Sequence, residues 1–340
     1  SSTGWAGGLI GQMFVDSDGF DGAAAGTANI TSSFATGAVT ISNAKNAYAG
    51  GLIGDHSVDA TEWDYTATGT SNISDCYATG DVLISSAVTL AYAGGLVGYN
   101  NALSVAYATA TANANITTSY ATGDVTITSA PTSAAGGLIG HNYINPYVLY
   151  SNDSISSGDI TDSYASGAVA ATAATDAYAG GLVGWNYGRS EVEFTGTATA
   201  SADITTSYAI GSATASGGSS KNYAGGLVGL HQKSGTGTVV VLNCFATGVA
   251  AGDASSIGGL VGVNTSGTIT TSYWFNATND YGIGNPQAVG NKVANTAYFY
   301  DSTNAPLSSW TFDATHWQID SSESYPYLYH QVWTWTGSGD

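Results

Sequence analysis

The stretch ITTSYATGDVTITSAPTSAAGGLIG, residues 116–140, combines two short phrases that recur along the chain. Its closing phrase, Ala-Gly-Gly-Leu-Ile-Gly with small variations, occurs seven times. The first glycines of the seven pairs are Gly7, Gly50, Gly94, Gly136, Gly180, Gly225 and Gly258. Subtracting each number from the next gives spacings of 43, 44, 42, 44, 45 and 33 residues. A nearly constant period of this length is typical of solenoids and propellers.

The opening phrase of the stretch also occurs seven times, always in the same phase between the glycine pairs. Its copies begin at Ile30, Ile73, Ile116, Ile160, Ile204, Val241 and Ile269. Apolar and small polar residues alternate within each copy, which is the period of a strand and not of a helix. We therefore predict an all-β fold, a parallel β-solenoid with about three short strands per copy.

Segments rich in Thr and Ala separate the two phrases in most copies, for example from Val105 and from Glu193. These inserts predict an additional sheet or stacked arms. The last spacing, of 33 residues, indicates a copy with less of the insert.

The chain is acidic and poor in charged residues. Among its 340 residues, 5 are Lys or Arg and 24 are Asp or Glu, which gives a formal net charge of −19. This charge repels phosphate backbones and anionic lipid headgroups, so nucleic acid and membrane surfaces are poor partner candidates, and we expect neither nucleic-acid binding nor membrane insertion. Every apolar run is shorter than the ~20 residues of a membrane helix. Because the sequence opens at SSTG without Met, we expect a mature exported protein, located outside the cell or on its surface.

GGLVGVNTSGTITTSY, residues 258–273, resembles the GLUG repeat of large bacterial and archaeal surface proteins, including adhesins of the filamentous-haemagglutinin type. WTFDATHWQIDSSESYPYL, residues 310–328, is similar to the aromatic segment that commonly closes GLUG arrays. The resemblance implies a GLUG-repeat solenoid over residues 1–275. It also implies an aromatic-rich segment over residues 276–340, which either caps the solenoid or docks onto another subunit. The family is defined by a structural repeat and not by a reaction.

One turn position recurs two residues after the last glycine of each glycine phrase. Its occupants are Met13, His56, Asn100, Asn142, Asn186, His231 and Asn264. We predict that these side chains form a ladder that satisfies the backbone of the corner, and that the histidines replace Asn in it and do not bind metal. His141, one place earlier in its copy, shares the outward register of Tyr99 and Trp185 and is expected at the surface.

Cys76 and Cys244 occupy equivalent positions four copies apart, where Ser is the usual residue. With one coil per copy they would be roughly 19 Å apart, which is beyond the reach of a disulfide. We predict two small buried residues, with an intermolecular bridge as the alternative.

Asp16, Asp18 and Asp21 surround a glycine turn in a pattern that resembles part of a calcium-binding loop. The bidentate Glu that completes such a loop is missing, so an acidic surface turn is the alternative. Asp81 and Asp124 would lie in neighbouring coils, where their repulsion requires solvent exposure or a shared cation. Calcium is the one cofactor that the sequence suggests.

The chain contains six Asn-x-Ser/Thr sequons, which make an exported protein a candidate for glycosylation. They are at Asn29, Asn72, Asn115, Asn152, Asn264 and Asn276. The first three share one position of the repeat, and Asp159 and Asp203 occupy this position in later copies. A turn that requires a polar residue is therefore the alternative interpretation.

No catalytic constellation is visible, because the basic residues are scattered and no carboxylate pair departs from the repeat pattern. We therefore predict an extracellular structural protein and not an enzyme. The first copy would present unpaired backbone groups, which accept a strand from another subunit. Head-to-tail docking of this kind makes the chain its own partner and builds a filament. The suggested contact residues are Trp5, Trp310, Trp317, Tyr325, Tyr327, Trp333 and Trp335.

Two alternatives remain open at this point. An adhesin module would bind glycans or other cell surfaces through aromatic side chains such as Tyr99, His141 and Trp185, because aromatic rings stack on sugar faces. Ice or crystal binding would use rows of Thr such as those around Thr111 and Thr197, but residues 147–157 interrupt the row.

Overall fold

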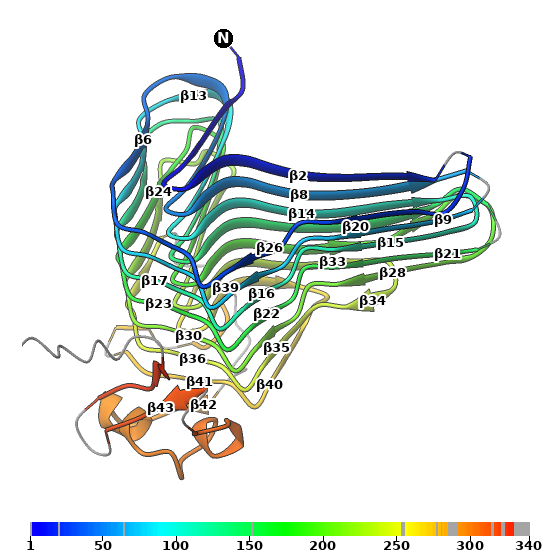
Figure 1. Ribbon diagram of the computed structural model, residues 1–340. Helices are drawn as coiled ribbons and strands as arrows, with labels where there is room; N and C mark the ends of the chain where they lie inside the picture. The colour runs from blue at the N-terminus through cyan, green and yellow to red at the C-terminus, as the bar shows by residue number, and fades with distance from the viewer. Residues whose placement is uncertain are drawn as a thin grey trace, which may run out of the picture.

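The computed structural model confirms a parallel β-solenoid (Figure 1). It describes residues 2–19, 21–63, 65–150, 152–252, 256–276, 278–279, 281–284, 291–313, 316–320 and 324–329. The glycine pairs stand in a column: Gly50 pairs in register with Gly7 on one side and with Gly94 on the other. In the described part of the chain, no helix is both long and apolar enough to cross a membrane.

Each coil contributes up to six strands, one to each of six parallel sheets, and not the three strands expected from the sequence. Sheet A holds the strands that lead into the glycine pairs: β1 (Gly4–Gly7), β7 (Ala44–Gly50), β13 (Ala87–Gly94), β19 (Thr132–Gly136), β25 (Asp176–Gly180), β32 (Lys221–Gly225) and β38 (Ile257–Gly258). Sheet B holds the strands that follow them: β2 (Ile10–Gly19), β8 (Ile53–Glu62), β14 (Val97–Ala106), β20 (Ile139–Val148), β26 (Val183–Arg189), β33 (Val228–Ser234) and β39 (Val261–Thr265), with β27 (Glu191–Val192) beside β20.

The Thr- and Ala-rich inserts form sheet C: β3 (Ala24–Thr27), β9 (Thr66–Thr70), β15 (Thr109–Asn113), β21 (Asp153–Ser157), β28 (Thr197–Ser201) and β34 (Gly237–Thr238). Sheet D holds β4 (Ile30–Thr31), β10 (Ile73–Ser74), β16 (Ile116–Thr117), β22 (Ile160–Thr161), β29 (Ile204–Thr205), β35 (Val240–Leu242) and β40 (Thr268–Thr270).

Sheet E holds β5 (Phe34–Ala35), β11 (Tyr77–Ala78), β17 (Tyr120–Ala121), β23 (Tyr164–Ala165), β30 (Tyr208–Ala209), β36 (Phe245–Ala246), β41 (Tyr273–Trp274) and β42 (Asn291–Lys292). Sheet F holds β6 (Val39–Ile41), β12 (Val82–Ile84), β18 (Val125–Ile127), β24 (Val169–Thr172), β31 (Ala213–Ser216) and β37 (Ala250–Ala251).

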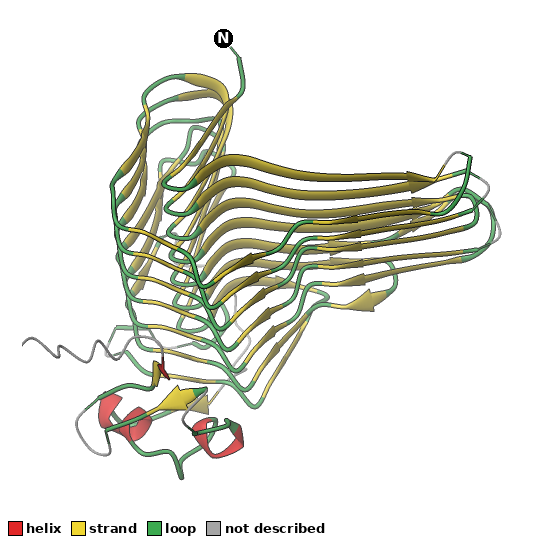
Figure 2. Cartoon of the chain, in the orientation of Figure 1, coloured by secondary structure: helices red, strands yellow, loops and turns green. Residues whose placement is uncertain are grey.

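The cross-section of the coil is bent, with two arms that diverge from a common corner (Figures 1 and 2). Sheets B and C pack face to face in the longer arm, which confirms the stacked arm predicted from the inserts. Sheets A and F pack in the shorter arm, where most buried residues are Ala. Larger side chains, such as Leu96 and Ile116, fill the corner between the arms. The small residues of the arms allow two sheets to approach closely, and the corner supplies most of the bulky apolar core.

The glycine pair is required where the chain turns from sheet A into sheet B. A Cβ on Gly50 would lie 1.9 Å from the carbonyl oxygen of Ile53. A Cβ on Gly51 would lie 2.1 Å from the carbonyl oxygen of Gly95 in the next coil. Both distances are far shorter than any real contact, so sterics explain why the pair recurs.

A second sharp corner joins sheets D and E, and there the chain uses residues other than glycine. The corner residues have φ between 44 and 54° in every coil: Ser32, Asp75, Thr118, Asp162, Thr206, Asn243 and Thr271. For β-branched residues such as Thr118 this left-handed conformation is strained.

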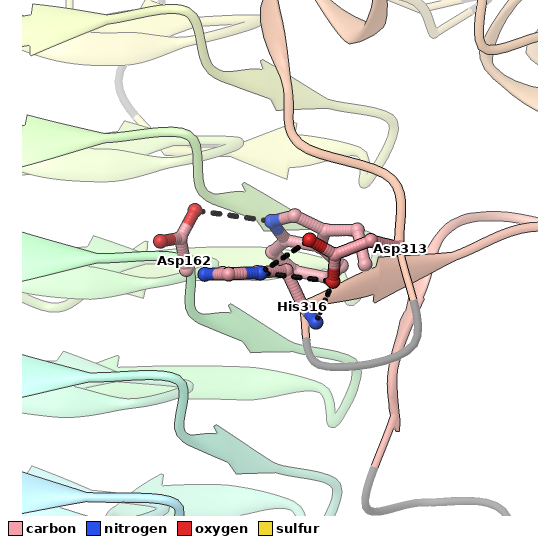
Figure 3. Close-up of polar contacts among 4 residues, drawn as sticks. Asp162, Asp313 and His316 are labelled. Atoms are coloured by element: carbon pink, nitrogen blue, oxygen red, sulfur yellow. Dashed lines mark hydrogen bonds and ion pairs between the residues drawn. The ribbon is translucent and has the colours of Figure 1, made fainter.

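The C-terminal segment packs on the side of the solenoid. It contains two short 3-10 helices, η1 (Thr296–Tyr300) and η2 (Leu307–Ser309), and an antiparallel pair, β43 (Trp317–Gln318) and β44 (Tyr327–Leu328). Together with Tyr164, Tyr208 and Phe245 of sheet E, this segment forms an aromatic cluster. The indole nitrogen of Trp317 donates to Oδ1 of Asp162 across 3.1 Å, and Nδ1 of His316 lies 2.9 Å from Oδ1 of Asp313 close by (Figure 3).

Candidate functional site

The feature with the most binding potential is the concave elbow between sheets A and B, which we call the elbow groove. Two rows of side chains face each other there, with one residue per coil in each row. Sheet A contributes Trp5, Tyr48, Tyr92, Ala134, Tyr178 and Tyr223. Sheet B contributes Gln12, Asp55, Tyr99, His141, Trp185, Leu230 and Val263. The central coils therefore give the groove an aromatic floor.

His141 is the centre of this floor. Its ring stacks on Trp185 with centroids 4.3 Å apart, and it meets the edge of Tyr92 at 4.7 Å. It is 5% exposed, so the expectation of a surface residue is wrong. Its register is outward as predicted, but sheet A and the rings of the neighbouring coils cover it. Burial lowers the pKa of His141 to about 3, so the imidazole is neutral at physiological pH.

Several polar atoms of the floor have no hydrogen-bond partner among the described residues. They are Nδ1 and Nε2 of His141 and Nε1 of Trp185. A buried polar atom without a partner costs about 1–3 kcal/mol. Because these atoms are enclosed and have almost no accessible surface, they are a cost within the floor and not a surface that a ligand contacts.

Two adjoining pockets open over this floor. One has a volume of about 280 Å³ and is bordered by Tyr48, Tyr99 and His141. The other has a volume of about 470 Å³ and is bordered by Tyr178 and Lys221. The two pockets share Leu90, Tyr92, Trp185 and Tyr187. They therefore belong to one groove. The larger pocket has the volume of a typical small-molecule site, and the smaller one is only slightly below that range.

The larger pocket has a polar rim. Nζ of Lys221 lies 3.6 Å from Oδ2 of Asp176 and 3.4 Å from the hydroxyl of Tyr178. Burial, with the charge of Asp176, raises the pKa of the Tyr178 hydroxyl, which is therefore a neutral donor and acceptor. A cation, a carboxylate and a hydroxyl thus stand together beside aromatic rings.

The predicted ladder is present from His56 to His231, where every member is fully buried. At its two outer positions, Met13 offers no polar group and Asn264 is half-buried and bonds Gly267 instead. Nδ2 of Asn100 donates to Oδ1 of Asn142, and Nδ2 of Asn142 donates to Oδ1 of Asn186, both across 2.8 Å. Each amide also donates to a backbone carbonyl of its own coil at 2.8 or 2.9 Å. All the amides point the same way, so the ladder has a direction.

Histidines terminate this ladder. Nδ1 of His56 lies 2.6 Å from Oδ1 of Asn100, and because the Asn100 amide is already donating elsewhere, Nδ1 of His56 carries the proton. At the other end, Nδ1 of His231 accepts from Asn186 across 3.3 Å, and its Nε2 donates to the carbonyl of Val239 across 3.1 Å. Burial lowers the pKa of both histidines to about 4. Their role is structural, as the sequence predicts.

Both cysteines are free and buried, as predicted. Sγ of each lies near a backbone carbonyl of its own coil, 3.1 Å for Cys76 and 3.2 Å for Cys244. Burial raises the pKa of the Cys244 thiol to about 12. Neither thiol has the environment of a nucleophile.

The structure does not gather the predicted calcium ligands. Asp16 and Asp18 lie on the exposed face of β2, and Asp21 lies in the turn beyond it. Among the described residues, no group of three or more His, Cys, Asp or Glu is arranged to hold a metal ion. Asp16 instead pairs in register with Asp59. Burial, followed by the charges of Asp16 and Asp55, raises the pKa of Asp59 to about 6.

Asp81 and Asp124 are exposed, which is one of the two arrangements expected for neighbouring carboxylates. Oδ1 of Asp81 accepts the backbone N–H of Asp124 across 2.9 Å, and Oδ1 of Asp124 accepts that of Ala168 across 2.8 Å. Their carboxylates therefore bond the backbone of the next coil.

Three of the sequon residues form a comparable outer ladder. Oδ1 of Asn29 accepts the backbone N–H of Asn72, and Oδ1 of Asn72 accepts that of Asn115, at 2.9 and 3.2 Å. Oδ1 of Asn115 accepts the N–H of Asp159 across 2.8 Å. Asn and Asp both carry this acceptor oxygen, so either residue can accept the backbone N–H of the next coil. This explains why Asp159 and Asp203 replace Asn at the same position in later copies.

The other three sequons differ in exposure. Asn152 is exposed, whereas Asn264 is half-buried and donates to the carbonyl of Gly267. Asn276 is 3% exposed, and its amide donates to the carbonyl of Gly248 and to Asn279.

The residues suggested for self-assembly fall into three groups. Trp5 is 43% exposed in the first coil. Trp310 and Trp317 are buried against the chain's own sheet E, and Tyr325 and Tyr327 are half-buried in the same segment. The expectation that Trp310 and Trp317 dock onto another subunit is therefore wrong for this conformation, since sheet E already accepts them. Trp333 and Trp335 lie outside the described residues.

The row of Thr expected on sheet C is interrupted, as the sequence indicates. Ile155 stands in register between Thr111 and Thr199, and Asp153 stands beside Thr197. The face therefore lacks the regular rows that ice binding needs.

Comparison with protein families adds one match: residues 132–170 match the GLUG motif. This stretch runs from the start of β19 into β24 and includes strands of all six sheets, so the motif corresponds to one turn of the solenoid. The resemblance to GLUG-repeat proteins is thereby confirmed. No curated protein and no solved structure matches the chain.

Proposed function

We propose that the chain is an extracellular adhesin module that binds glycans in the elbow groove. The observation that carries this proposal is the aromatic floor of the groove beside a polar rim formed by Lys221, Asp176 and Tyr178. Sugars combine apolar ring faces with hydroxyl groups, and a site for them needs aromatic surface together with donors and acceptors. The module is a binding protein and not an enzyme.

The orientation of the rings supports the same ligand. The rings of Tyr92 and Tyr99 are inclined at 34°, and those of Tyr178 and Trp185 at 56°. Rings from the two sheets are therefore inclined to one another and do not form one parallel stack. GLUG repeats occur in adhesins, which is consistent with a surface location.

Glycan-array binding of the whole chain tests this proposal. We expect hits that are lost in Trp185→Ala and weakened in Lys221→Ala, which is the milder change because Lys221 lies at the rim. Trp63→Ala is the matched control, since Trp63 is 45% exposed and belongs to none of the groove rows. Circular dichroism on each variant separates loss of the site from loss of the fold. An array without hits, or equal binding by the Trp185 and Trp63 variants, contradicts the proposal.

Filament formation is a second candidate function, favoured by the first coil. Its strands β1 to β6 form one edge of all six sheets, and each has a strand neighbour on one side only within the described residues. Four large apolar side chains are exposed there: Trp5 at 43%, Leu9 at 51%, Phe14 at 52% and Phe34 at 53%. Open strand edges with apolar side chains favour pairing with another chain.

Negative-stain electron microscopy and sedimentation at high protein concentration test the filament. We expect fibres that Leu9→Asp abolishes, because a charge at the first coil would be buried in the contact. Val88→Asp is the control, since Val88 is 59% exposed on an interior coil. Dispersed monomers at high concentration exclude this function.

A further inference from the structure

The walls of the elbow groove restrict which glycan it accepts. We infer, on the basis of the proposed function, that the ligand is a neutral, linear oligosaccharide that lies parallel to the solenoid axis with one sugar residue facing each coil. Direction, spacing and charge each support one part of this inference.

The direction follows from the walls, which are ladders along the axis. The wall from sheet A consists of Leu90, Thr132, Asp176 and Lys221, each in register with the next. The opposite wall, from sheet B, consists of Tyr143, Tyr187 and Gln232, also in register. All of them border one or both pockets. A chain that contacts both walls over this length must run along the axis.

The spacing follows from the strands. Neighbouring strands lie ~4.8 Å apart, which is close to the advance of one pyranose residue in a linear chain. Each coil places one polar side chain on either wall: Thr132 with Tyr143, then Asp176 with Tyr187, then Lys221 with Gln232. Successive sugar residues therefore meet successive polar pairs, and a branch or a tight bend in the glycan would lose this match.

The charge of the groove favours a neutral ligand. Among the described residues, Lys221 is the only cation in the lining of the two pockets, and Asp176 lies beside it at 3.6 Å, so the two charges offset each other. Arg189 donates to the hydroxyl of the wall residue Tyr143 and is itself paired with Glu191. His141 is uncharged. Asp55, 6% exposed in the row that forms the floor, adds a carboxylate and no cation. With a net charge of −19 over the chain, the groove repels uronate, sialate and sulfate groups.

Calorimetry of the whole chain with oligosaccharides of increasing length tests the inference. The probes are linear neutral gluco-, xylo- and manno-oligosaccharides of one to six residues, with oligogalacturonates as the acidic counterpart. We expect affinity to rise with length up to about three or four residues at ~4.8 Å per coil, since three coils place polar side chains on both walls and Leu90 extends the sheet A wall to a fourth. The oligogalacturonates should not bind.

Two wall variants and one control sharpen this test. Gln232→Ala and Thr132→Val each remove one wall contact, and each should lower the affinity for a tetrasaccharide roughly three- to tenfold, as expected for one hydrogen bond. Thr199→Ala, on the outer face of sheet C, should leave it unchanged. Saturation transfer NMR should show contact to every residue of a bound tetrasaccharide.

The outcomes separate this inference from the proposed function. If a monosaccharide binds as tightly as a tetrasaccharide, or if an acidic oligosaccharide binds best, the groove is still a glycan site but the axial, neutral ligand is excluded. The same holds if the wall variants bind like the Thr199 control while Trp185→Ala fails to bind. If no glycan binds at all, both proposals fall.

Discussion

His56 and His231 terminate one buried ladder with opposite tautomers. His56 holds its proton on Nδ1 and donates to Asn100, whereas His231 holds its proton on Nε2 and accepts from Asn186 at Nδ1. The direction of the amides between them determines both states. A chain of aligned hydrogen bonds inside a low-dielectric core is cooperative, so each rung depends on its neighbours.

Asn142, in the middle of this ladder, should be the most costly polar residue to remove. Asn142→Ala deletes the acceptor of Asn100 and the donors to Asn186 and to the carbonyl of Gly158, and it leaves these groups unpaired and buried. We expect a loss of about 2–4 kcal/mol in the free energy of unfolding, measured by chemical denaturation. Thr199→Ala on sheet C should change it by about 0.5 kcal/mol or less. If Asn142→Ala also changed the free energy of unfolding by only about 0.5 kcal/mol, like Thr199→Ala, the ladder would not be cooperative.

Stability should fall below pH 6.5 because of the two ladder histidines. Their pKa is about 4 in the folded chain, against 6.5 when exposed, so the unfolded chain binds more protons between these values. The contribution is complete above pH 6.5 and is lost as the pH falls towards 4, by about 3 kcal/mol per histidine. His141, whose pKa burial lowers to about 3, adds a loss in the same direction. Asp59, whose pKa is raised to about 6, acts in the opposite direction over part of this range.

The double variant His56→Asn with His231→Asn tests this dependence. Asn supplies the same donor at one end and the same acceptor at the other, as in the interior rungs, and it does not titrate. Urea denaturation at pH 7 and pH 4.5 should show a much smaller difference for the variant than for the native chain. The assigned tautomers can be checked by ¹⁵N chemical shifts of the imidazoles. An unchanged pH dependence in the variant would place its origin elsewhere, for example in His141.

Much of the fold was predictable because the repeat constrains it locally. The column of glycine pairs follows from their period, and the ladder follows from the repeated turn position that Asn100 represents. The arms were only partly predictable. The Thr- and Ala-rich inserts predict an additional sheet or stacked arms, but the sequence did not reveal that the strand after each glycine pair continues far beyond the phrase, as β8 does, so that sheets B and C both run along the longer arm.

The site depended on tertiary contacts that no single repeat contains. His141 is buried because Tyr92 and Trp185, from the coils on either side, enclose it, and because Ala134 replaces the ring that sheet A places in the adjacent coils. The docking of the C-terminal segment was also missed. A signal was available, since the Tyr or Phe of the second phrase faces outward in every coil and leaves an apolar stripe, including Tyr164 and Tyr208, for another segment to cover.

Gly137 should tolerate no side chain, because the backbone of the next coil occupies the space that a Cβ would need. In Gly137→Ala the new Cβ would lie 2.1 Å from the carbonyl oxygen of Gly181 and 2.7 Å from Cβ of Ala165. We expect a loss of at least about 2–3 kcal/mol in the free energy of unfolding, or failure to fold. Gly37→Ala is the control, since nothing lies within 4 Å of its added Cβ. Equal thermal stability of the two variants would mean that the coils can separate without cost.

Replacing Thr118 with glycine should stabilise the fold, in contrast to the replacement of Gly137 with alanine. Its φ of 48° is strained for a β-branched residue, so Thr118→Gly should raise the free energy of unfolding by roughly 0.5–1 kcal/mol. Thr117, the neighbouring residue in β16, has the extended conformation of a strand, and Thr117→Gly should lower the stability instead. Thermal unfolding of the Thr118→Gly and Thr117→Gly variants should therefore show changes in stability of opposite sign. If both variants are less stable than the native chain, the corner at Thr118 is not strained.

Enzymatic glycosylation of the chain should divide the six sequons by exposure. Asn152 is exposed and should be modified, whereas Asn276 is buried with its amide bonded and should not be. Asn29, Asn72 and Asn115 keep their acceptor oxygens when the amide nitrogen is modified, but neighbouring rungs are only ~4.8 Å apart, so glycans on all three would collide. Glycopeptide mass spectrometry of the native chain should find at most two of these three occupied in one molecule. A glycan on Asn276, or on all three rungs together, would contradict the packing described for these corners.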